Sequence, residues 1–187
     1  QIYNIFEILE KYNKTLLIHG ELNRSDIDIF DREKYFIDEE LQKIRKSFKD
    51  LKIVLEHVSS DYGVDFVKTN NNIAGTITPH HMLLTKKDVF KDEVVNPHHY
   101  CMPVVKNEND LLSLRKAACF NNSKFFLGTD SAPHHVDHKK QNDTLKAGIF
   151  SSSNSIELYA LIFEEENALE NLEIFSSING PKFYNMN

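Results

Sequence analysis

Three apolar runs in this 187-residue chain end in side chains that could bind a metal ion. His19 follows "TLLI", His57 follows "KIVLE", and Asp130 follows "KFFLGT". Imidazole nitrogen and carboxylate oxygen are common ligands of zinc-like ions. The three residues are remote from one another in the sequence, so they form one site only if the fold brings the ends of the three runs together.

Each of these residues also has a structural interpretation. His19 or His57, taken alone, could be a hydrogen-bonded histidine of the core. Asp130 is harder to explain in that way, because a carboxylate that follows three apolar residues is costly to bury unless a cation or several donors compensate it. Taken together, the three residues favour a metal site.

The remaining histidines divide into two groups. We expect four of them to be surface or turn residues: His98, His99, His135 and His138. Two that follow a further apolar run stay undecided: His80 and His81.

Apolar runs alternate with amphipathic segments along the chain. The runs predict strands at 15–20, 52–57, 72–78 and 124–130. The periodic segments predict helices at 2–12, 30–48, 60–69, 108–120, 155–167 and 168–176. We expect loops at 78–106 and 131–150, and a Gly-Pro stop signal at 180–181.

This alternation predicts a parallel α/β sheet, in either a doubly wound sheet or a (βα)8 barrel. No G-x-G-x-x-G or G-x-x-x-x-G-K-[ST] motif follows a strand, which removes support for a nucleotide-binding open sheet. A barrel instead places its chemistry at the carboxyl ends of the strands, where the polar residues lie. A whole barrel needs eight strands and about 250 residues. We therefore expect the four strands found here to form about half of a barrel.

Composition excludes several classes of function. The chain is 41% hydrophobic and 27% charged, with a formal net charge of −6 and no basic stripe, so binding to nucleic acid has no electrostatic support. No apolar run approaches the roughly 20 residues of a membrane span, and the first residues given do not show the basic segment and apolar segment that a secretory signal has. We expect a cytoplasmic protein. Cys101 and Cys119 lack C-x-x-C spacing and are expected to be small buried hydrophobes.

Eight segments carry a resemblance to a known family: "LLIHGE", "DIDIFDRE", "VLEHVSS", "TITPHH", "NPHHYCMPVVK", "FLGTDSAPH", "AGIF" and "NGPKFY". In this order and near-spacing they resemble dihydroorotase of the short bacterial type, within the amidohydrolase superfamily. The resemblance runs from about residue 2 to 184, and "FLGTDSAPH" is its most specific part.

The resemblance implies a barrel with a binuclear zinc centre that cyclises N-carbamoyl-L-aspartate reversibly to dihydroorotate in pyrimidine biosynthesis. It implies that His19 and His57 bind one zinc ion, and that Asp130 binds the other and shuttles the proton. His134 matches the histidine that contacts a substrate carboxylate. Backbone atoms at Met102 and near Ala147 match further substrate contacts.

The family also has an H-x-H pair and a carbamylated lysine that bridges the metals, and neither can be placed in this chain. We therefore expect residues 1–187 to be the C-terminal half of one barrel domain, inactive alone. The intact enzyme is expected to be a homodimer that acts on a small-molecule substrate. Two alternatives stay open: another cyclic-amide hydrolase of the superfamily, and a metal-free pseudoenzyme that serves as a scaffold.

Overall fold

The computed structural model describes residues 2–91, 94–120, 122–140 and 145–186. Its main sheet has four strands in the order β1-β2-β3-β6, all parallel. They are β1 (Leu16–His19), β2 (Ile53–Glu56), β3 (Ile73–Ile77) and β6 (Phe125–Leu127). A small antiparallel pair consists of β4 (Phe90–Lys91) and β5 (Val94–Val95).

Helices connect the strands in the order that the sequence predicts. They are α1 (Ile2–Lys11), α2 (Arg32–Phe36), α3 (Gln42–Ser47), α4 (Asp61–Thr69), α5 (Pro79–Leu83), α6 (Lys86–Val89), α7 (Glu108–Cys119), α8 (Val136–Lys140), α9 (Ser155–Glu165) and α10 (Asn179–Tyr184). The described residues also contain π-helical turns at Ile37–Leu41 and Ile174–Ile178 and a 3₁₀ turn at Leu169–Asn171. Among these helices, none has the length and apolar content that crossing a membrane requires.

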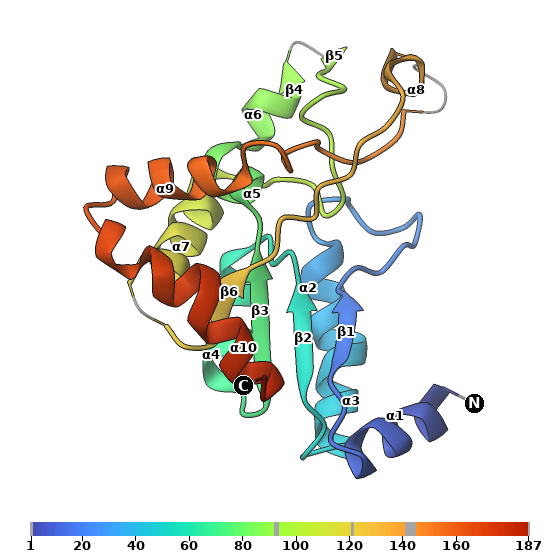
Figure 1. Ribbon diagram of the computed structural model, residues 1–187. Helices are drawn as coiled ribbons and strands as arrows, with labels where there is room; N and C mark the ends of the chain where they lie inside the picture. Colours follow the sequence, from blue (N-terminus) through green and yellow to red (C-terminus); the bar gives the residue numbers. More distant parts are fainter. Residues whose placement is uncertain (1, 92–93, 121, 141–144, 187) are drawn as a thin grey trace.

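The two faces of the sheet are covered differently. On one face, Ile53, Leu55 and Ile73 belong to a large core that α3, α4, α7 and α9 complete. On the other face, Val54, Ala74 and Phe126 form a small cluster with Phe183 and Tyr184. Figure 1 shows α10 in front of β3 and β6, with α2 and α4 behind the sheet. Most of the helices thus cover the first face, as in the outer wall of a barrel, and α10 covers part of the second.

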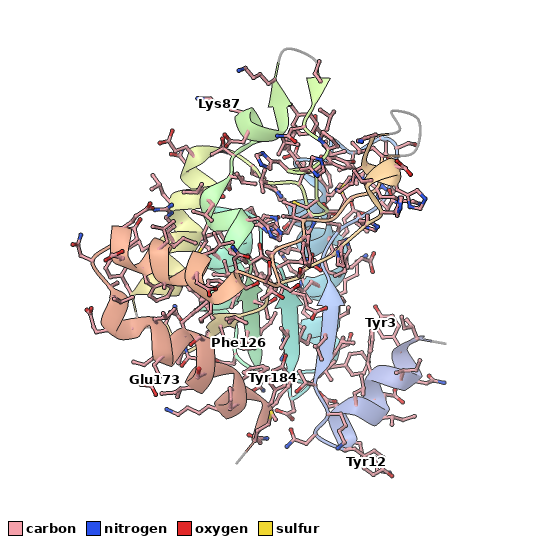
Figure 2. All side chains as sticks on the ribbon, turned by 45° about the horizontal axis from the view of Figure 1, so that its top comes forward. Tyr3, Tyr12, Lys87, Phe126, Glu173 and Tyr184 are labelled. Atoms are coloured by element: carbon pink, nitrogen blue, oxygen red, sulfur yellow. The ribbon has the colours of Figure 1, made fainter. Side chains whose placement is uncertain are left out.

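The end of α10 closes the lower part of this second face. The rings of Phe126 and Tyr184 lie 5.6 Å apart between centroids, edge to face, and Figure 2 labels both. Lys52 Nζ donates a hydrogen bond to the carbonyl of Phe183 at 3.1 Å. The polar side chains of the candidate site lie at the carboxyl ends of the strands, above the part of this face that α10 covers.

Four expectations from the sequence need correction. The run at 15–20 predicted a strand buried on both faces, but the edge strand β1 is partly buried on one face, and Leu17 on its other face is 49% exposed. The segment 78–106 contains α5, α6 and the β4-β5 pair, with residues 92–93 outside the described part. The segment 131–150 contains α8, with 141–144 outside it. Gly180-Pro181 lies in the first turn of α10, where proline is tolerated because amide hydrogens there have no intrahelical acceptor.

Candidate functional site

The first two strands bring His19 and His57 together. His19 pairs with Glu56 in the register of β1 and β2, and His57 is the next residue along. Nδ1 of His19 lies 2.9 Å from Nε2 of His57, with the two ring centroids 4.7 Å apart. Two ring nitrogens from separate strands therefore face one point at the carboxyl edge of the sheet.

The two rings have different surroundings. Nε2 of His19 lies 3.3 Å from a carboxylate oxygen of Glu21, and this hydrogen bond, opposed by burial, raises the pKa of His19. Burial, followed by the charge of His19, lowers the pKa of His57 from 6.5 to about 4. His57 is therefore neutral at neutral pH and keeps a nitrogen lone pair, which is the form that binds metal ions.

The backbone at two of the predicted site residues is in the left-handed region. His57 has a φ of 41° and Asp130 a φ of 42°. The other non-glycine residues with positive φ in the described part are all asparagines: Asn13, Asn72, Asn167 and Asn185. Asparagine is the residue that adopts this conformation most readily after glycine. Unfavourable backbone angles of this kind concentrate at functional sites, where they aim a side chain.

Asp130 shares a small cavity with His57. The cavity has a volume of about 140 Å³ and its lining residues are Glu56, His57, Thr76, Gly128 and Asp130. Partial burial raises the pKa of Asp130, and the charge of His19 opposes this. The residue as a whole is exposed. Because the chain after β6 lies at the open rim of the sheet, the cost of full burial, from which the sequence argued for a cation, does not arise in this chain.

Thr76 and Gly128 set the spacing inside this cavity. The Thr76 hydroxyl accepts a hydrogen bond from the backbone N–H of His57 at 2.7 Å, which holds the unusual turn after β2. A Cβ atom at Gly128 would lie 2.5 Å from the Cβ of Thr76. Glycine is needed at 128 because the threonine that supports His57 occupies that space.

A buried polar network holds the segment after His57. Glu33, on α2, is 1% exposed. One of its carboxylate oxygens accepts from the backbone N–H and the hydroxyl of Ser59, both at 2.8 Å, and the other accepts from the Ser60 hydroxyl. Lys106 Nζ donates to the Ser59 hydroxyl at 2.6 Å. The network connects α2 and the segment before α7 to the turn that carries His57.

The predicted substrate contacts lie in a neighbouring part of the same rim. Nε2 of His134 lies 2.9 Å from the carbonyl oxygen of Ala147. Ser131 pairs with Ile149 as a parallel β-bridge. The amide of Gly148 donates to the carbonyl of Tyr100 at 2.9 Å, two residues before Met102. His134, Ala147 and the Met102 loop are thus tied together through backbone contacts.

The other histidines differ in how deeply they are buried. His98, His135 and His138 are exposed and His99 is partly buried, as expected of surface and turn residues. His98 lines a cavity of about 330 Å³ that His134 also lines. His80 and His81, which the sequence left undecided, are both buried.

Three residues that matter here were not assigned a role from the sequence: Glu21, Thr76 and Glu33. Glu21 follows His19 by two residues, and an acidic residue so close to the end of a strand was the available signal. Thr76 and Glu33 gave no signal, because a threonine in a strand and a glutamate in a charged helix are both ordinary.

Comparison with known proteins agrees with this architecture, although no family model matches the chain. A dihydroorotase from Aliivibrio fischeri (strain ATCC 700601 / ES114) is 48% identical over 186 residues, which cover 99% of this chain and 54% of that protein. The crystal structure of dihydroorotase from Saccharomyces cerevisiae in complex with 5-fluoroorotic acid matches 99% of this chain and 54% of its own, at 36% identity and a TM-score of 0.89. L-Hydantoinase from Arthrobacter aurescens shares the fold, at 15% identity and a TM-score of 0.79.

These matches confirm the predicted fold class, which is about half of a (βα)8 barrel. The relatives are amidohydrolase barrels, and this chain matches about half of the length of each. The chain spans about half the length of the curated relatives it matches. In sequence and in fold, it corresponds along nearly its whole length to about half of a dihydroorotase, as its motifs predicted.

Proposed function

We propose that this chain supplies the C-terminal half of a dihydroorotase barrel, and that the intact enzyme interconverts N-carbamoyl-L-aspartate and dihydroorotate. The observation that carries this proposal is the approach of Nδ1 of His19 to Nε2 of His57 beside the cavity that Asp130 lines. In a chain 48% identical to a dihydroorotase, this arrangement suits a metal-assisted hydrolysis of a cyclic amide.

The two histidines fit a zinc ion. Two nitrogen ligands, each about 2.0–2.1 Å from a tetrahedral zinc ion, lie about 3.3 Å apart, so the observed 2.9 Å requires only a small separation of the rings. The Glu21 carboxylate beside the other nitrogen of His19 is the partner that orients a ligating imidazole. When bound, zinc supplies Lewis-acid polarisation of the amide carbonyl and lowers the pKa of water. Asp130 would bind the second zinc ion, and the remaining ligands, including the carbamylated lysine, are expected from residues outside this chain.

Asp130 is proposed to move the proton. Its carboxylate lines the same cavity as His57, and a cation beside it would keep it ionised and able to accept a proton. In hydrolysis it accepts the proton of the attacking water and passes it to the departing ring nitrogen. In cyclisation it returns the proton, so that water leaves.

His134 is proposed to bind the substrate carboxylate. Because the carbonyl of Ala147 can only accept, Nε2 of His134 donates in the observed contact. When the ring is protonated, Nδ1–H is also a donor, and it can bind a carboxylate while the bond to Ala147 persists. Backbone atoms near Met102 and Ala147 would then contact the rest of the substrate.

Two further expectations about the intact enzyme stay predictions. Homodimer formation follows from the family resemblance alone, and light scattering of the intact enzyme would test it. Action on a small-molecule substrate is inferred from the same resemblance, and the cytoplasmic location stays the expectation drawn above from composition.

A chimaera tests the proposed function. Residues 1–187 would be joined to the part of the A. fischeri enzyme that this chain does not match, and hydrolysis of dihydroorotate, dihydropyrimidine and hydantoin would be followed. We expect turnover of dihydroorotate alone, and none by the unfused chain. Preferential hydrolysis of hydantoin would indicate another cyclic-amide hydrolase, and a folded, zinc-free, inactive chimaera would indicate a scaffold.

A further inference from the structure

A second group of ligand-type side chains lies deeper in the molecule: His80, His81 and Cys101. One ligand atom of each, two ring nitrogens and the thiol sulfur, lie within 4.8 Å of one another. All three residues are at most 4% exposed. None of them belongs to the hydrolytic site proposed above.

His80 is the residue of this cluster whose side chain makes no hydrogen bond. Neither of its ring nitrogens has a hydrogen-bond partner, although both are buried. Each buried polar atom left unpaired costs about 1–3 kcal/mol. Burial, followed by the charge of His57, lowers the pKa of His80 to about 3, so the ring is neutral and one nitrogen carries a free lone pair.

His81 is held in the tautomer that a metal ligand needs. Its Nε2 lies 2.9 Å from the carbonyl of Pro103, so this nitrogen carries the hydrogen. Its Nδ1 therefore has the lone pair, which accepts from the Thr78 hydroxyl at 2.7 Å. A carbonyl that fixes one nitrogen while the other faces a ligand is the usual arrangement around a ligating histidine. A metal ion that bound Nδ1 would take over this lone pair from the threonine hydroxyl.

Cys101 offers the third donor. Its thiol donates to the carbonyl of Pro103 at 3.2 Å, and burial raises its pKa to about 12. A metal ion that binds the sulfur releases the thiol proton to solvent, and no electron is transferred. The Pro103 carbonyl keeps its hydrogen bond from His81.

The charge and the number of these three ligands favour a monovalent metal ion over a divalent one. One thiolate and two neutral imidazoles carry a single negative charge, which neutralises a monovalent cation completely. A divalent ion would leave a net positive charge in a buried place, and Lys106 already adds positive charge beside His81 and Cys101. Zinc prefers four ligands, and within the described residues no further histidine, cysteine or carboxylate joins the cluster, so a water molecule would have to be the fourth ligand in this buried place. Soft thiolate ligands select Cu⁺.

We propose that His80, His81 and Cys101 form a buried, three-coordinate site for a soft monovalent cation of the Cu⁺ type. An ion there would join α5, directly after β3, to the loop that carries Met102. Its ligands are different from those of the hydrolytic centre, and its test does not depend on dihydroorotase activity.

Titration of the reduced chain with Cu⁺ under anaerobic conditions, against a coloured Cu⁺ chelator, tests this site. We expect one Cu⁺ per chain, and X-ray absorption should report one sulfur and two nitrogen donors. Cys101→Ser and His80→Leu should each weaken binding by at least about 100-fold, since loss of an outer-shell partner alone already costs 10–100-fold. Zn²⁺ titrated in parallel should not bind at this cluster.

Two controls locate the ion. Cys119→Ser removes the other buried thiol and should leave Cu⁺ affinity unchanged, as should His19→Ala at the hydrolytic site. Loss of binding in His19→Ala with retention in Cys101→Ser would place the ion at the hydrolytic site and overturn the proposal. If Cys101→Ser does not fold, X-ray absorption of the unmodified chain with bound Cu⁺ provides the test. A spectrum that shows no copper–sulfur distance would also overturn the proposal. Zn²⁺ binding at the cluster as tight as Cu⁺ would overturn the choice of ion.

Discussion

Replacement of Glu33 by alanine should destabilise the chain far more than an ordinary surface substitution does. Its carboxylate is the acceptor for three hydrogen bonds from Ser59 and Ser60, and Lys106 acts on it through the Ser59 hydroxyl. Removing it leaves these donors buried without an acceptor and Lys106 without a compensating charge. Breaking a buried charged network by removing one partner costs about 3–5 kcal/mol. The milder Glu33→Gln, which keeps one acceptor oxygen, should cost about 1–3 kcal/mol.

Urea denaturation gives the free energy of unfolding for each variant. Glu39→Ala is the matched control, because Glu39 also precedes β2 and forms an ion pair with Arg24 at 2.8 Å, but on the surface. Exposed pairs of this kind contribute up to about 1 kcal/mol. Equal losses in Glu33→Ala and Glu39→Ala, both below about 1 kcal/mol, would refute the claim that the buried network holds the turn after β2.

Three further predictions concern the same rim of the sheet. Because the pKa of His80 is lowered from 6.5 to about 3, the unfolded chain binds more protons than the folded chain between these values, so stability should fall below pH 6.5. The fall approaches about 1.4 kcal/mol per pH unit from this residue, and urea midpoints at several pH values in wild type and His80→Gln measure it. Gly128→Ala should cost about 1–3 kcal/mol in the free energy of unfolding, because the new Cβ overlaps that of Thr76. A melting temperature equal to that of the wild type would contradict this. Tyr159→Phe removes the hydroxyl that donates to the carbonyl of Ile77 at 2.7 Å and should cost about 1–3 kcal/mol, as chemical denaturation would measure.

The sequence predicted the strands and the residues at their ends because both follow from local patterns. Apolar runs long enough for a strand, each followed by a polar residue, marked the ends of β1 and β2 to within one residue, whereas β6 ends at Leu127, three residues before Asp130. Parallel pairing then brings these ends to one edge, which is why His19 and His57 meet although 38 residues separate them.

What the sequence did not predict depends on tertiary contacts. Glu33 looks like any glutamate of a charged helix, and its importance comes from the two serines that the fold places beside it. The second face of the sheet is covered by α10, whose Gly-Pro sequence is typical of a helix end. Leu17 and Asp130 are exposed because other parts of the fold do not cover them. The residue pattern of a short strand does not show which of its side chains the rest of the fold will cover.

Turnover of dihydroorotate by the chimaera with Asp130 replaced by asparagine tests the central claim most directly. Asparagine keeps the size of the side chain and removes its basicity. A positioned general base contributes about 10²–10⁴-fold to the rate, so we expect kcat to fall by at least about 100-fold with the zinc content measured alongside. A variant that retains its zinc and turns over dihydroorotate within about threefold of the unmodified chimaera would contradict the role given to Asp130, and with it the site at the ends of β1, β2 and β6.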